Sequence, residues 1–136
     1  MMFFKTEDIL VDKKIVAKVF RYKKRKFSGI KFFTSKELNL QVGFMSHNSQ
    51  HSIQPHYHLK RGKIIKDMSE FLIIFKGKIK VLFYNKKKVF VKSSVLNAKD
   101  MILIISGAHG FKILKKTEML EIKQGPFVGE KDKKRF

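Results

Sequence analysis

Short apolar runs separated by polar turns recur along the whole chain. The segment Lys14–Tyr22 alternates apolar and basic residues, the pattern of a strand with one buried face. Residues 71–75 are continuously apolar, as in a strand covered on both faces, and Lys76-Gly77 is expected to end that strand. Further strands are expected at 30–33, 38–45, 78–84, 89–95, 101–105, 110–114 and 119–123.

This spacing predicts an all-β domain. Many short strands joined by polar turns are typical of a sandwich or a barrel. A short helix is compatible only with residues 34–38, where Ser35 can cap it. The 136 residues fit one domain, with residues 1–13 as an N-terminal arm and 125–136 as a C-terminal tail.

Composition narrows the class of protein. The chain has no cysteine, which excludes disulfides and zinc-thiolate sites. Its apolar runs are too short to cross a bilayer, and its start lacks the pattern of a signal peptide. We therefore expect a cytoplasmic protein with no membrane partner.

The net charge of +20 calls for a separate interpretation. The basic residues are mostly lysines, scattered over turns and alternate strand positions, and no helix-turn-helix or aromatic-basic RNA-binding pattern accompanies them. We expect a solvated basic surface and no nucleic-acid partner. Attraction to an anionic ligand is the main alternative, and nucleic-acid binding is a weaker one.

Histidines carry the candidate chemistry. His56 and His58 are two residues apart, so in a strand both imidazoles point to the same face and can chelate one divalent metal. Glu70 precedes an apolar run, where a carboxylate needs a partner or a metal. His109 lies between Gly107 and Gly110, in a predicted tight turn.

These motifs resemble those of the cupins. The first cupin motif is matched by His56-Tyr57-His58, then Glu70, then Gly77 after six residues, and the second by Lys99-Asp100 and by Gly107-Ala108-His109. The resemblance covers a motif core at 54–113 and implies a double-stranded β-helix, or jelly roll. It also implies a metal site formed by His56, His58, Glu70 and His109. Residues 59–69 form a longer insertion than the family motif has at this place.

The chain is more closely similar to small cupin-like proteins associated with surface-polysaccharide and sugar-nucleotide pathways. The shared segments are Gln54-Pro55-His56, the Lys76-Gly77-Lys78 strand, residues 106–111 and the tail from Glu121 to Phe127. The resemblance implies that an anionic sugar or sugar-nucleotide type of small molecule is bound.

Several functions are compatible with this site. The leading hypothesis is an isomerase or epimerase with His56, His58 and His109 as catalytic residues and a divalent Fe, Mn, Ni or Zn ion as cofactor. A non-catalytic binding module, a metal-free isomerase with histidine as acid or base, and a metal-dependent dioxygenase are the alternatives. Lys60, Arg61 and Gln124 are candidate substrate contacts.

The resemblance and the N-terminal pattern together predict a homodimer. Apolar strands at 2–4 or Lys14–Tyr22 are the segments expected to pair across a two-fold axis.

Overall fold

The computed structural model describes residues 4–24 and 26–136, and these form an all-β structure. Its strands are β1 (Phe4–Val11), β2 (Lys14–Tyr22), β3 (Gly29–Phe32), β4 (Gly43–Ser46), β5 (Glu70–Tyr84), β6 (Phe90–Asn97), β7 (Met101–Ile104) and β8 (Ala108–Lys123). One short 3-10 helix, η1 (Gly129–Asp132), follows β8. No helix among the described residues is long and apolar enough to cross a membrane.

The chain begins with a hairpin. β1 pairs with β2 through a turn in which Asp12 and Lys13 both have positive φ, as two-residue hairpin turns require. β2 has the bounds that its alternating pattern predicts. Within the N-terminal arm expected at 1–13, residues 4–11 form β1, which pairs with β2 along its whole length. Met2 and Phe3, at the start of the expected dimer strand, lie outside the described residues.

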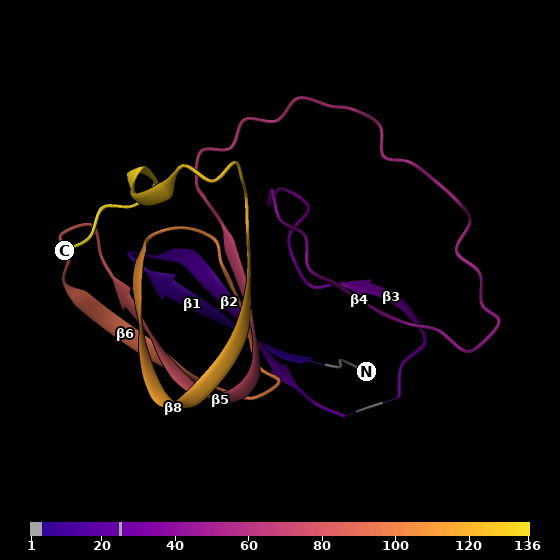
Figure 1. Ribbon diagram of the computed structural model, residues 1–136, viewed down its shortest axis with the longest axis horizontal. Coiled ribbons are helices and arrows are strands. Elements are labelled where there is room, and N and C mark those ends of the chain that lie inside the picture. Colours follow the sequence, from indigo (N-terminus) through magenta and orange to yellow (C-terminus); the bar gives the residue numbers. More distant parts are fainter. Residues whose placement is uncertain (1–3, 25) are drawn as a thin grey trace.

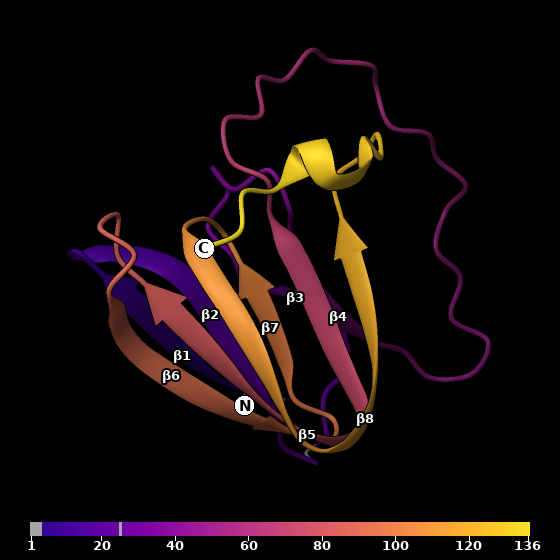
Figure 2. The same cartoon turned by 60° about the vertical axis from the view of Figure 1, so that its left-hand side comes forward.

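Most strands belong to one strongly curled antiparallel sheet (Figures 1 and 2). Its order is β1-β2-β7-β5-β6, and β8 lies along the other side of β5. β7 pairs with the first residues of β5 and β6 with the last, whereas β8 pairs with nearly all of it.

β5 and β8 are each longer than their apolar runs predict. Lys76-Gly77 does not end the strand; it sits where the β5–β8 register shifts and both strands bend. Gly77 has φ +88, and a Cβ on it would lie 2.1 Å from the Lys116 carbonyl oxygen. Glycine is therefore needed because the two backbones meet there, so the bend replaces the expected break.

The two faces of the sheet have separate apolar clusters. The concave face buries a cluster that includes Leu72, Ile74 and Val81. The opposite face buries Phe4, Phe20 and other residues beneath the separate β3–β4 hairpin. Phe44 of β4 packs against Phe4 with ring centroids 5.5 Å apart.

Residues 47–69 form the long extended loop that swings away from the sheet in Figure 1. No strand is assigned within it, so the expected strand at His56 and His58 is absent from the described chain. Most of its side chains are exposed, including Tyr57 at 85% and Leu59 at 77%. The expected helix at 34–38 is also not formed; these residues make turns.

Candidate functional site

Glu70 and His109 meet across the curled sheet. His109 Nε2 lies 3.1 Å from Glu70 Oε2, and both side chains are largely shielded from solvent. In the β5–β8 ladder Glu70 pairs with Lys123 and His109 with Phe83, so thirteen residue steps of β5 separate the two positions. A straight strand would hold them roughly 40 Å apart. The curl of β5 and β8 therefore brings the two ends of one ladder face to face.

Hydrogen bonds determine the protonation state of His109 in this geometry. Its Nδ1 lies 3.1 Å from the Gly107 carbonyl oxygen and its Nε2 faces the Glu70 carboxylate. The carbonyl only accepts, and the Glu70 carboxylate only accepts when it is ionised, so with Glu70 ionised both ring nitrogens donate, which is the arrangement of a protonated imidazole.

The pKa values of the pair move in opposite directions. Burial lowers the pKa of His109, but the hydrogen bonds to Glu70 and Gly107 and the charges of Glu70 and Glu121 outweigh it and leave that pKa raised. The hydrogen bond from His109 lowers the pKa of Glu70 against the opposing effect of burial, and the charges of His109, Lys123 and Lys133 lower it further. The pair is therefore an ion pair over a wide range of pH.

A small polar network surrounds the pair. Lys123 is opposite Glu70 in the ladder and lies 3.5 Å from Asp132 of η1. Gln124 accepts a hydrogen bond from the backbone N–H of Ser69 at 2.9 Å, which fixes the start of β5. Gln124 was expected to contact substrate; in the structure its side-chain oxygen supports the residue before Glu70.

The wall of β8 beside this pair is uncovered. Phe111, Ile113 and Met119 pair with Val81, Ile79 and Ile74, whose side chains are fully buried on the concave face. Paired residues project to the same face of a sheet, yet Ile113 is 57% exposed and Met119 is 39% exposed. The concave face thus continues from the Glu70–His109 pair onto an open apolar surface.

His56 and His58 lie on the exposed loop. Their ring centroids are 5.4 Å apart, and His56 Nδ1 lies 2.9 Å from the carbonyl oxygen of Gln54. Because that carbonyl can only accept, Nδ1 is the donor in this contact, and in a neutral imidazole Nε2 would be the nitrogen available to a metal. Lys60 and Arg61 follow on the same loop and are also exposed.

The structure thus assembles the expected site in two separate halves. One half is Glu70 with His109 and the other is His56 with His58; among the described residues no group of three or more metal-binding side chains comes together. Metal binding by all four residues stays a prediction.

Two charged residues near the pair were not predicted. Glu121 and Lys123 are two residues apart in β8 and pair with Leu72 and Glu70 of β5. Both therefore project to the concave face, as their partners do. The period-two pattern of that strand was the available signal for both.

Comparisons of this chain with protein-family models, with curated proteins and with solved structures found no match.

Proposed function

We propose that this chain is a jelly-roll protein of the cupin type that binds one divalent metal and an anionic sugar or sugar-nucleotide type of small molecule, as an isomerase or epimerase. The observation that carries the proposal is the convergence of Glu70 and His109 from opposite ends of the β5–β8 ladder, next to an uncovered wall of β8.

The loop has the pattern of the strand that this wall lacks. Over 53–60, Ile53, Tyr57 and Leu59 alternate with polar residues that include His56 and His58. β8 pairs only with β5 among the described strands, so its other edge has free backbone groups. Packing of this segment along β8 would turn the histidine face toward Glu70 and His109, and would place Tyr57 and Leu59 on the other face, where β8 exposes Leu120 and Ile122.

The donor set fits a metal. Three imidazoles and one carboxylate suit Fe(II), Mn(II), Ni(II) or Zn(II), and in a neutral His56 the Nε2 would be available to bind. A bound ion would act as a Lewis acid that polarises a substrate carbonyl or enolate oxygen. Glu70 and His109 would have to exchange their mutual hydrogen bond for the ion, and Lys123 would remain beside them to attract an anionic substrate.

A second function, a metal-free isomerase, is favoured by the protonated geometry of His109. A histidine that donates from both nitrogens and is held by a carboxylate can keep a proton at Nε2 and deliver it to a substrate carbon or oxygen. Glu70 orients the ring and stabilises its charged form in that mechanism.

Elemental analysis distinguishes the metal-dependent function from the metal-free one. Protein expressed without added nickel should contain about one divalent ion per chain, with open coordination positions. The double change His56→Ala with His58→Ala should remove the ion, and circular dichroism should remain that of a β protein, because neither histidine contributes to the core. The matched control is His47→Ala with His51→Ala, which should retain the ion.

A metal content near zero in the wild-type protein would overturn the metal site. The pH–rate profile of isomerisation would then test His109 as the acid, since its raised pKa should appear as the basic limb.

A further inference from the structure

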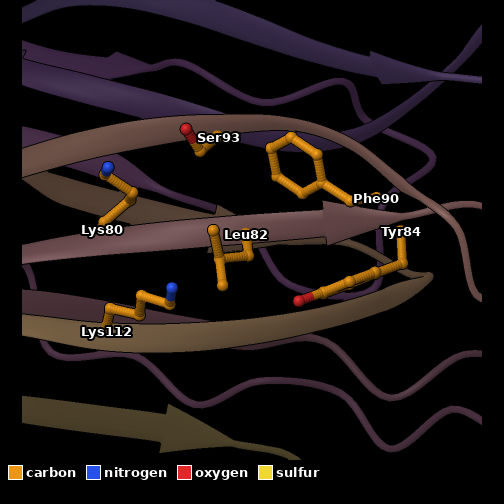
Figure 3. Close-up of a pocket in the computed structure, with 6 residues that line it drawn as sticks. All are labelled: Lys80, Leu82, Tyr84, Phe90, Ser93 and Lys112. Atoms are coloured by element: carbon orange, nitrogen blue, oxygen red, sulfur yellow. The ribbon is translucent and has the colours of Figure 1, made fainter. Parts of the chain in front are cut away.

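A pocket of about 370 Å³ lies on the convex side of the sheet, opposite the Glu70–His109 pair. It is lined by Lys80, Leu82 and Tyr84 of β5, Phe90 and Ser93 of β6, and Lys112 of β8 (Figure 3). The residues that alternate with them on β5, Ile79, Val81 and Phe83, are fully buried on the concave face. The pocket is therefore separate from the site discussed above.

Two lysines at one end of the pocket face each other without a counter-charge. Lys80 and Lys112 are direct partners in the β5–β8 ladder. Like charges directly opposite each other on neighbouring strands are destabilising. Neither ammonium group has an ion pair or a hydrogen bond within the described parts of the chain. An anion placed between them would relieve this repulsion.

The surrounding strands strengthen the positive potential. The sequence has no aspartate or glutamate between Glu70 and Asp100, and none between Asp100 and Glu118. These stretches supply most of β5, all of β6 and the first part of β8. All three strands around the pocket are thus free of acidic residues near it, and the field there favours an anion.

The other end of the pocket is aromatic. The ring of Tyr84 lies 6.1 Å from Phe90 and 5.3 Å from Phe136, in edge-to-face contacts. Gly110 lies beside this ring without a side chain, and a Cβ on it would lie 3.9 Å from the ring of Tyr84. In Figure 3 the hydroxyl end of Tyr84 is turned toward the lysine end, and Leu82 lies between the two ends.

We propose that this pocket binds a small organic phosphate, with the phosphate between Lys80 and Lys112 and a flat apolar ring against Leu82, Tyr84 and Phe90. A phosphate suits two ammonium groups and the nearby Ser93 hydroxyl, because it offers several charged acceptor oxygens. The volume, at the small end of the range for ligand pockets, fits a single ring and its phosphate rather than a polymer.

Calorimetric titration with phenyl phosphate tests the proposal, with inorganic phosphate and phenol as the two separate parts. Phenyl phosphate should bind at least about tenfold more tightly than either part, a difference of about 1.4 kcal/mol. The double change Lys80→Gln with Lys112→Gln should weaken its binding by about tenfold or more. Phe90→Ser should reduce the preference for phenyl phosphate over inorganic phosphate.

The matched control removes the same charge from the β5–β6 turn, by Lys86→Gln with Lys87→Gln. It should change the affinity less than about twofold, because those side chains do not line the pocket. Equal weakening by both double variants would show diffuse attraction to a basic surface and overturn the proposal. Absence of phenyl phosphate binding by the wild-type protein would also overturn it. Circular dichroism of each variant confirms that it is folded.

Discussion

The hydrogen bond between Glu70 and His109 makes the stability of the fold depend on pH. The pKa of His109 is raised above its ordinary 6.5, so its contribution is complete below that value and is lost as pH rises through the raised pKa. The pKa of Glu70 is lowered below its ordinary 4.5, so its contribution is complete above that value and is lost as pH falls through the lowered pKa. The pair therefore stabilises the folded protein most between pH 4.5 and pH 6.5.

In protein from which a chelator has removed any metal, His109→Gln should lower the free energy of unfolding by about 1 kcal/mol near pH 5.5, because a charged hydrogen bond is lost. The difference from wild type should shrink as pH rises through the raised pKa of His109. Urea unfolding at several pH values measures it. His56→Gln, an exposed histidine, is the matched control and should show no such trend. A pH-independent difference for His109→Gln would contradict the ion pair.

Gly77 is the residue on which the bend of β5 depends. Gly77→Ala should destabilise the protein by about 2 kcal/mol or more, because an L side chain is strained at φ +88 and its Cβ meets the Lys116 backbone. Gly62→Ala, at an exposed position with open space around it, should change the unfolding free energy by less than about 0.5 kcal/mol. Equal melting temperatures for the two variants would show that the corner is not as tight as described.

The bounds of an individual strand could be predicted where its residues follow one clear pattern. β2 follows from its alternation of apolar and basic residues. β5 and β8 were each predicted as two strands, β5 because Gly77 was taken as a break and β8 because the polar residues 115–118 separate its apolar runs. The close approach of the two backbones at Gly77, which lets both strands bend and continue, is not visible in the sequence of either strand. β1 was missed because acidic and basic residues interrupt its apolar positions; Arg21 of β2 pairs with Glu7 of β1 there.

The sequence indicated which residues could form the candidate site, but not how they are arranged in space. Glu70 and His109 come together because the sheet curls, a property of the whole β5–β8 ladder that neither motif contains. His56 and His58 carry a clear period-two pattern, but residues 59–69 leave their position relative to β8 undetermined by spacing.

Amide hydrogen exchange tests whether the segment at 53–60 pairs with β8. If it does, its amides should be protected at least about tenfold relative to an unstructured peptide, because inter-strand hydrogen bonds must open before exchange. Residues 62–66, which are exposed and lie outside any strand on the same loop, provide an internal reference. Exchange of 53–60 at the rate of residues 62–66 would contradict the pairing and the joint histidine site with it.

The strands of the main sheet that have one partner bear on association between copies of the chain. Among the described strands, β1 pairs only with β2, and β6 and β8 each pair only with β5. β8 also exposes apolar side chains on both of its faces, such as Ile113 and Ile122. Unprotected edges and exposed apolar surface favour pairing with a second chain. Light scattering should therefore give about twice the chain mass of 16.0 kDa, and a strict monomer at micromolar concentration would contradict the dimer.

The net charge of +20 leads to a prediction about nucleic acid. Lysines are distributed over both ends, several turns and alternate strand positions, so an extended duplex can contact only a few of them at once. Each phosphate contact releases counterions, and affinity that rests on such contacts falls steeply with salt. Binding of random duplex DNA should thus be measurable in low salt and weaker than about 1 µM at physiological salt. Fluorescence anisotropy across a salt series measures both, and nanomolar affinity that survives physiological salt would establish a nucleic-acid interface in place of a solvated basic surface.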